Sequence, residues 1–364
     1  MYEEFLNHIK EKYNYSDSII HAIRICIPAL VDEYGKDSED KVLKLFEDVR
    51  IITTNDMSTK HQKEIENEFM KDYNHHVVMI ENNPYEDTID PEAYYSFRPI
   101  FDDSLNVVNE MRWIVVDENK NNNGVGYQKL FGTPINIPNF LHELNHAYAM
   151  QNAVYVKTGN RIYNKHGMYI NEMVFEYDEE TKQYVQTEDI NYDILLEEAI
   201  NEMYTERQLA TLLHKESYDE VRKELNTINH VTNAYEGMLI IIAESFEKTL
   251  NSESLKEYRI NNEMSVRDIF NSVCSESKIT EKYIKENAWD YLGKKCFEMF
   301  KLAEIKYKIG IDEYSKRQLK LALDAFAPIY AHDEIKHGTA SLEKYEGKIR
   351  QLLGDDAVVE DPQR

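Results

Sequence analysis

Three residues between positions 138 and 150 have the types and the spacing needed to hold a metal ion and use it. His142, Glu143 and His146 form the pattern His-Glu-x-x-His. Residues four apart lie on one face of an α-helix, so both imidazoles can bind one ion while Glu143 faces a water molecule bound to it. The pattern therefore predicts metal-assisted hydrolysis. It leaves open a core helix whose two histidines hydrogen-bond to neighbouring side chains.

The residues around this pattern predict a short helix that is largely buried. Asn139 is a favourable N-cap residue, and Pro138 lies where the helix has not yet begun. Neither Gly nor Pro interrupts the segment that follows, and its apolar residues include Phe140, Leu141, Leu144, Ala147, Tyr148 and Met150.

A later helix is expected to supply a third ligand, because catalytic zinc sites usually have three protein ligands and an open position for water. The sequence predicts a helix that begins near Asp193, and Glu198 on it is the best candidate. Glu202 lies one turn later on the same face, where its carboxylate can accept the free ring N–H of a ligating histidine. Glu197 is about 100° round the helix from Glu198. The alternative for Glu197 and Glu198 is a solvated acidic face.

The order His-Glu-x-x-His, β-hairpin, Glu-Ala-x-x-Glu resembles the gluzincin metallopeptidases, most closely bacterial members with Gly or Ala after the first Glu of the second motif. Glu198 follows His146 by 52 positions, which that group accommodates. The resemblance covers about residues 127–206. It implies a zincin fold, a Zn²⁺ ion held by His142, His146 and Glu198, and hydrolysis of a peptide bond. A metzincin pattern does not apply, because Ala149 and Asn152 stand where that family has a Gly and a third His.

The resemblance also implies roles for residues around the metal. Glu143 acts as the general base, which takes a proton from the zinc-bound water and passes it to the leaving amine. Tyr192 is expected to stabilise the oxyanion, because the clostridial Pro-Pro endopeptidases, which this region resembles, carry a catalytic Tyr about two turns before their Glu ligand. Packing alone is the alternative for Tyr192. His230 and Tyr235 lie on the next helical segment and are further candidates for reaching the metal-bound oxygen.

Composition and charge limit the partners of the chain. Its 364 residues are 42% hydrophobic and 30% charged, as in ordinary globular proteins, and its net charge of -25 would repel nucleic acid and anionic membranes. Its three cysteines are too few and too far apart for a disulfide framework or a cysteine zinc site. No apolar run approaches the length of a membrane span, and no secretory signal is evident. We therefore expect a cytoplasmic protein whose partner is a peptide or protein substrate.

The residue pattern predicts an α+β fold with a zincin-like catalytic core, a small mixed β-sheet and an active-site helix. Residues 1–50 are expected to be helical, 51–250 to form the core, 251–354 to be predominantly helical, and 355–364 to be a flexible tail. Strands are expected near 49–53, 76–80, 93–97 and 112–116, with a hairpin over 168–186. By the same resemblance, a peptide substrate would pair with an edge strand, for which 127–131 and 113–116 are the candidates.

Two other functions remain open at this stage. The helical region from about residue 251 carries no catalytic pattern, which favours a non-catalytic zinc-binding or protein-interaction protein built on a zincin-like fold. The second alternative is a helical scaffold that binds no metal, in which the His-Glu-x-x-His pattern is accidental.

Overall fold

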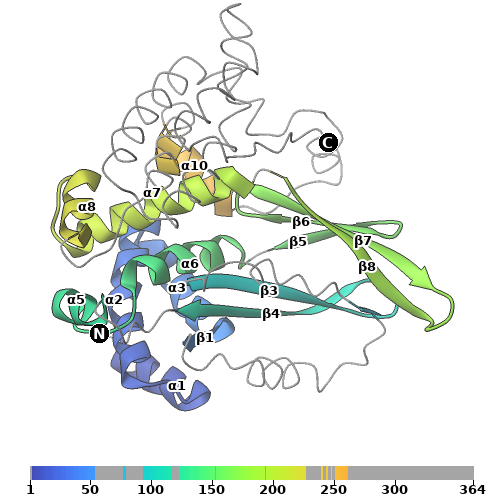
Figure 1. Cartoon of the computed structure of the whole chain (residues 1–364), viewed down its shortest axis with the longest axis horizontal. Helices are drawn as coiled ribbons and strands as arrows, with labels where there is room; N and C mark the ends of the chain where they lie inside the picture. Colours follow the sequence, from blue (N-terminus) through green and yellow to red (C-terminus); the bar gives the residue numbers. More distant parts are fainter. Residues whose placement is uncertain are drawn as a thin grey trace, which may run out of the picture. The chain divides into compact units, whose positions relative to one another are not determined.

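The computed structural model describes residues 2–53, 77–78, 93–116, 123–151, 153–192, 194–226, 239–240, 243–244, 247 and 251–260. It shows the predicted α+β architecture, with helices and two β-sheets (Figure 1). Internal contacts divide the chain into two compact units. The first comprises residues 1–192, 204–230 and 256–269, and the second residues 193–203, 231–255 and 270–364.

The N-terminal region is helical, as predicted. Helix α1 spans Glu3–Tyr13, α2 spans Asp17–Tyr34, the 3₁₀ turn η1 spans Lys36–Ser38, and α3 spans Glu39–Asp48. The hydroxyl of Ser16 caps α2 by accepting a 3.3 Å hydrogen bond from the N–H of Ile19. At the other end of α2, Gly35 has a φ of +96°, a conformation that few other residues adopt.

A three-stranded mixed sheet follows and contains three of the four strands predicted for it. Residues 77–78, within the predicted strand near 76–80, pair in the second sheet instead. Strands β1 (Arg50–Thr53), β3 (Ala93–Phe101) and β4 (Val107–Val116) have the order β1-β4-β3. β1 pairs with β4 in parallel, and β3 pairs with β4 in antiparallel fashion. β4 is therefore the central strand. Among the strands that the structure describes, β3 has a neighbour on one side only.

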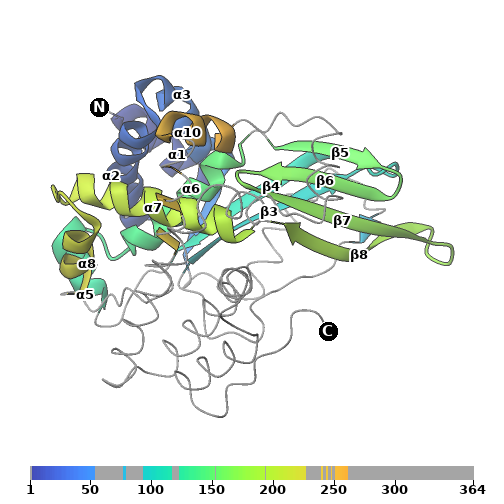
Figure 2. The ribbon, with the colours of Figure 1, turned by 90° about the horizontal axis from the view of Figure 1, so that it is seen from above.

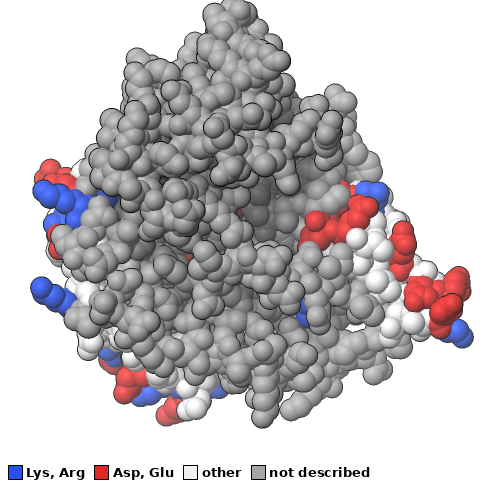
Figure 3. All heavy atoms as spheres, in the orientation of Figure 1, with Lys and Arg blue, Asp and Glu red and all other residues white. Residues whose placement is uncertain are grey.

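A second sheet contains β2 (Val77–Val78), β5 (Val154–Thr158), β6 (Arg161–His166), β7 (Tyr169–Asp178) and β8 (Gln183–Tyr192). Its order is β2-β8-β7-β6-β5, and Figure 2 shows β5 to β8 side by side. The predicted β7–β8 hairpin is confirmed, whereas the sequence did not predict β5 and β6. Acidic side chains gather at the tip of the β7–β8 hairpin (Figure 3), where Glu176, Glu179 and Glu180 are exposed.

The remaining helices are α5 (Asn123–Phe131), α6 (Ile137–Ala149), α7 (Ile194–Leu212), α8 (Tyr218–Asn226) and α10 (Ser252–Ile260). Helix α7 begins where the sequence predicted it, and its two halves belong to the two different units. The prediction of a strand over 127–131 is wrong, because these residues form the second half of α5. Among the described residues, no helix is long and apolar enough to cross a bilayer.

Two apolar clusters in the first unit fix the surroundings of α6. The larger cluster joins α1, α2 and α3 to α6 and to the inner face of β1 and β4, and includes Ile27, Phe46, Ile114, Leu141 and Leu144. The smaller cluster packs the far end of the β3–β4 hairpin on β6 and β7 through Phe101, Leu105, Ile162, Met173 and Phe175. The hairpin is thus held at both ends.

Several sequence predictions fall outside the described residues. His230, Tyr235, nearly all of the C-terminal helical region 251–354 and the tail 355–364 are among them; only residues 251–260 of that region are described.

Candidate metal centre

Helix α6 carries the His-Glu-x-x-His residues, and its N-terminus differs from the prediction. The helix begins at Ile137, and the side chain of Asn136 caps it by accepting a 3.2 Å hydrogen bond from the N–H of Asn139. Pro138 therefore lies inside the first turn, where its missing N–H leaves no helical bond unmade. The prediction that Asn139 is the cap is therefore wrong by three residues. The prediction that Pro138 precedes the helix is also wrong, because Pro138 is its second residue.

The two histidines face in one direction, as their spacing requires. The ring centroids of His142 and His146 are 5.0 Å apart, with 71° between the ring planes. His146 is buried, while His142 and Glu143 are half-buried. The side chains therefore sit at the boundary between the protein interior and its surface, where a ligand can reach them.

Asn145, between the motif residues, locks α6 in place through a buried polar network. Its amide donates to Thr205 (3.2 Å) and Gln208 (2.9 Å) on α7 and accepts from Tyr34 (2.9 Å) on α2. The buried guanidinium of Arg259 on α10 donates to the main-chain oxygen of Asn145 (3.0 Å) and to the hydroxyl of Tyr34 (2.7 Å). Since buried polar groups are costly to leave unpaired, this network fixes the rotation of α6 about its axis.

The same network determines which face of α7 turns toward the histidines. Thr205 contacts Asn145, and Glu198 lies seven residues earlier, two turns along the same helical face. Ala199 beside it is fully buried and Glu198 is half-buried. Glu197, about 100° round the helix, is only 1% exposed, so it does not belong to a solvated acidic face.

His142, His146 and Glu198 form a group whose ligand atoms all lie within 4.8 Å of one another. Two donors that each lie about 2.1 Å from a tetrahedral ion are about 3.4 Å apart. Side-chain rotations that shorten the separations by up to about 1.4 Å would bring all three donors to bonding distance. Two imidazoles and one carboxylate are also a donor set that zinc accepts in catalytic sites. The residues present therefore fit a zinc ion.

The edge strand β3 lies against the general base predicted from the sequence. The main-chain N–H of Tyr95 donates a 2.6 Å hydrogen bond to Oε2 of Glu143, and β3 runs beside α6 in Figure 1. Sequence reasoning missed this contact, since nothing in a strand pattern shows which strand will meet a helix 48 residues later. Burial of the Tyr95 ring raises the pKa of its hydroxyl far above the usual value, so the phenol stays protonated.

Neither segment predicted as the substrate-binding edge fits that role. Residues 127–131 are helical. Residues 113–116 belong to β4, which is bonded to β1 on one side and to β3 on the other, so its backbone groups there are already paired. In the described sheet β3 is the edge strand that lies next to Glu143.

The structure describes two of the other predicted site residues in part. Tyr192 is the last residue of β8, opposite Ile170 on β7, and lies two residues before α7 begins. Glu202 lies on α7 one turn after Glu198 and is half-buried. The roles of Tyr192, Glu202 and His230 stay predictions.

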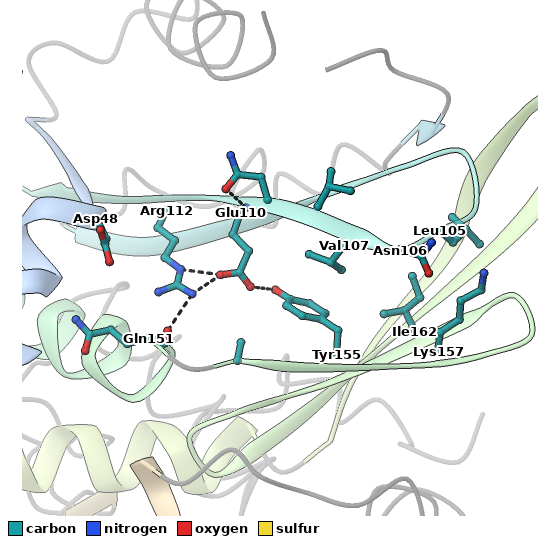
Figure 4. A pocket seen from close by; sticks show the side chains of 13 residues that line it. Asp48, Leu105, Asn106, Val107, Glu110, Arg112, Gln151, Tyr155, Lys157 and Ile162 are labelled. Carbon is teal, nitrogen blue, oxygen red and sulfur yellow. Dashed lines mark hydrogen bonds and ion pairs between the residues drawn. The ribbon is translucent and has the colours of Figure 1, made fainter. Parts of the chain in front are cut away.

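A second group of polar side chains lies beyond the C-terminal end of α6, in a cavity of about 780 Å³. Figure 4 shows Arg112 and Glu110 of β4 joined by an ion pair, with Nε of Arg112 2.9 Å from Oε2 of Glu110. Tyr155 of β5 donates to the other carboxylate oxygen, and Nη2 of Arg112 also donates to the main-chain oxygen of Gln151 (3.4 Å). Burial and the Glu110 carboxylate raise the pKa of Tyr155, which keeps this donor protonated.

Buried His166 on β6 completes the surroundings of this ion pair. The ring centroids of His166 and Phe97 are 4.1 Å apart, and His166 is fully buried. Burial lowers the pKa of the imidazole well below its usual value, and the positive charge of Arg112 lowers it further. His166 is therefore neutral at physiological pH.

No family model, curated protein or solved structure matches this chain.

Proposed function

We propose that the protein is a zinc-dependent metallopeptidase of gluzincin type, with a zincin-like catalytic core. The observation that carries this proposal is the grouping of His142 and His146 on α6 with Glu198 on α7, which follows His146 by 52 positions. Glu143 directly follows His142 on α6. An accidental motif gives no reason for Glu198 to lie within reach of the two histidines.

Each residue has a distinct role in the proposed reaction. His142, His146 and Glu198 hold the metal, and Glu202 orients a ligating imidazole by accepting its free N–H. A bound zinc ion would supply a Lewis acid that makes its water acidic and polarises the peptide carbonyl. Glu143 takes the proton of that water and delivers it to the leaving amine. Tyr192 and His230 are the proposed donors to the oxyanion.

The substrate in this proposal is an extended stretch of a peptide or protein. In the described sheet, β3 has an open strand edge next to Glu143. A peptide that pairs with such an edge is bound through main-chain hydrogen bonds, which depend little on its side chains. The net charge of -25 favours neutral or basic peptides over acidic ones and disfavours nucleic acid and membrane surfaces as partners. The small number of cysteines favours the cytoplasm as its compartment.

Metal analysis tests the proposal directly. The purified protein should hold about one zinc ion per chain, and His146→Ala should lose it while keeping its circular dichroism spectrum. A random-sequence peptide library should then be cut by the zinc-loaded protein, with the products identified by mass spectrometry.

The same library separates the enzyme from a non-catalytic zinc-binding protein. Glu143→Gln should retain zinc and lose cleavage. An unaltered protein that holds no zinc would end the proposal, and one that holds zinc but leaves the whole library uncut would favour the binding function.

A further inference from the structure

The hydrogen bond between Tyr95 and Glu143 reveals the direction of the backbone groups along β3. β3 and β4 pair in antiparallel fashion, with Tyr95 opposite Ile114. In such a ladder, alternate residues point both N–H and C=O toward the partner strand or away from it. The N–H of Tyr95 is engaged by a side chain of α6, so Tyr95 belongs to the outward set. Ala93, Phe97 and Pro99 have the same parity.

Pro99 is an independent check on this assignment. Proline has no N–H, and within sheets it occurs where the N–H would face away from a paired neighbour. Pro99 lies opposite Glu110 in an unbroken part of the register, four residues after Tyr95. The outward edge of β3 therefore has N–H donors at Ala93, Tyr95 and Phe97 and none at Pro99.

The N–H of Tyr95 is thus a donor that two acceptors would compete for. At 2.6 Å from Oε2 of Glu143, it is fully engaged by a strong, charged acceptor. A peptide that adds to this edge needs the same N–H for one of its own carbonyl groups, and a single N–H makes one well-aligned bond at a time.

We propose that Glu143 rests on the N–H of Tyr95 in the free protein, and that a peptide pairing with β3 takes over this N–H and releases the carboxylate for the reaction. This inference rests on the proposed peptidase function. The release of the base then depends on binding of an extended main chain. A ligand too short to pair at Tyr95 leaves Glu143 bonded to the N–H of Tyr95. A longer bound peptide receives no hydrogen bond from residue 99, because Pro99 has no N–H.

A matched set of four double variants tests the exchange. Tyr95→Ala and Tyr95→Pro both remove the side chain, but only Tyr95→Pro removes the N–H, at an outward position where proline is tolerated. Each is combined with Glu143→Gln, whose side-chain oxygen can still accept from residue 95, and with Glu143→Ala, which cannot. The probe is a fluorescein-labelled peptide that the unaltered protein cuts in the library, and its dissociation constant is measured on the four inactive, zinc-loaded proteins.

With Ala at position 95, the Glu143→Ala protein should bind the peptide about three- to tenfold more tightly than the Glu143→Gln protein, because no side chain competes for the N–H. With Pro at position 95, the two should bind within about twofold of each other. An equal ratio in both backgrounds would overturn the inference. Zinc content and thermal melts show whether each variant is folded.

Amide exchange gives a second measurement that needs no peptide and no change at Tyr95. The Tyr95 N–H should exchange with deuterium about tenfold faster in Glu143→Ala than in the unaltered protein. Equal rates would show that Glu143 does not cover this N–H. If the library is uncut and the rates differ, the contact exists and the peptidase function fails. If the library is cut and the rates are equal, the function stands and the inference fails.

Discussion

Two carboxylates beside the β3–β4 hairpin are held in contrasting ways. Glu143 accepts from a main-chain N–H of β3, whereas Glu110 accepts from the guanidinium of Arg112 and the phenol of Tyr155. The main-chain N–H that donates to Glu143 carries no net charge. The largely buried guanidinium of Arg112 forms an ion pair with Glu110 and fixes its geometry. The contrast fits the general-base role proposed for Glu143 and a structural role for Glu110.

The largest expected effect concerns activity. Glu143→Gln should lower kcat of the proposed peptidase by about 10²- to 10⁴-fold, because it removes the proton acceptor while keeping the shape of the side chain. Glu110→Gln is the matched control and should keep kcat within about tenfold. Initial rates on a library peptide measure both. A comparable loss in the two variants would abolish the contrast between the carboxylates.

Stability should respond in the opposite order. Arg112→Leu leaves Glu110 without its cation at a site where the side chains of Arg112 and Glu110 are only 11% and 16% exposed. We expect the free energy of unfolding to fall by about 3 kcal/mol, measured by urea denaturation. Glu143→Gln should change it by less than about 1 kcal/mol. If Arg112→Leu is no less stable than the unaltered protein, the ion pair does not have the structural role assigned to it.

The pH dependence of stability should report on the surroundings of the ion pair. His166 has a lowered pKa in the folded state, so below its unfolded pKa of about 6.5 the unfolded chain binds the extra proton and the folded protein does not. Stability should therefore fall as the pH decreases below about 6.5, by at most about 1.4 kcal/mol per pH unit from this residue. His166→Gln should flatten the curve between pH 5 and 6.5 in denaturant titrations. An unchanged slope would mean that other groups dominate acid unfolding.

The smallest expected effect concerns the second donor to Glu110. Tyr155→Phe removes one hydrogen bond to a charged group and preserves the ring, so the free energy of unfolding should fall by about 1.5 kcal/mol. In the Arg112→Leu background the loss should be larger, because Tyr155 is then a principal remaining donor to the carboxylate. Additive losses in urea denaturation would show that the two donors act independently.

Local spacing made the grouping of the proposed metal ligands predictable. The i, i+4 relation places His142 and His146 on one face wherever the segment is helical, and Asp193 marks the start of α7 within one residue. The β7–β8 hairpin was likewise predictable from two strand-like runs around a polar turn. These features depend on residues close together in the sequence.

Features that depend on distant pairing were not predictable in the same way. Residues 127–131 are too short a segment for their pattern to distinguish a strand from a helix, and only the structure shows that they continue α5. The contact of Tyr95 with Glu143 joins a strand to a helix whose relative placement no periodicity encodes. A usable clue did exist for the ion pair, since Glu110 and Arg112 are two apart on a strand and must share a face.

The hydrogen bond from Arg259 to the main chain of α6 limits where this protein can be truncated without disturbing that helix. A fragment that ends at residue 250, the end of the core expected from the sequence, would lack the guanidinium of Arg259, which donates hydrogen bonds to Asn145 and Tyr34. Those two residues would keep their other bonds but lose a charged donor in the interior. A fragment meant to retain α6 in its native setting should therefore extend at least through Ile260, the last residue of α10.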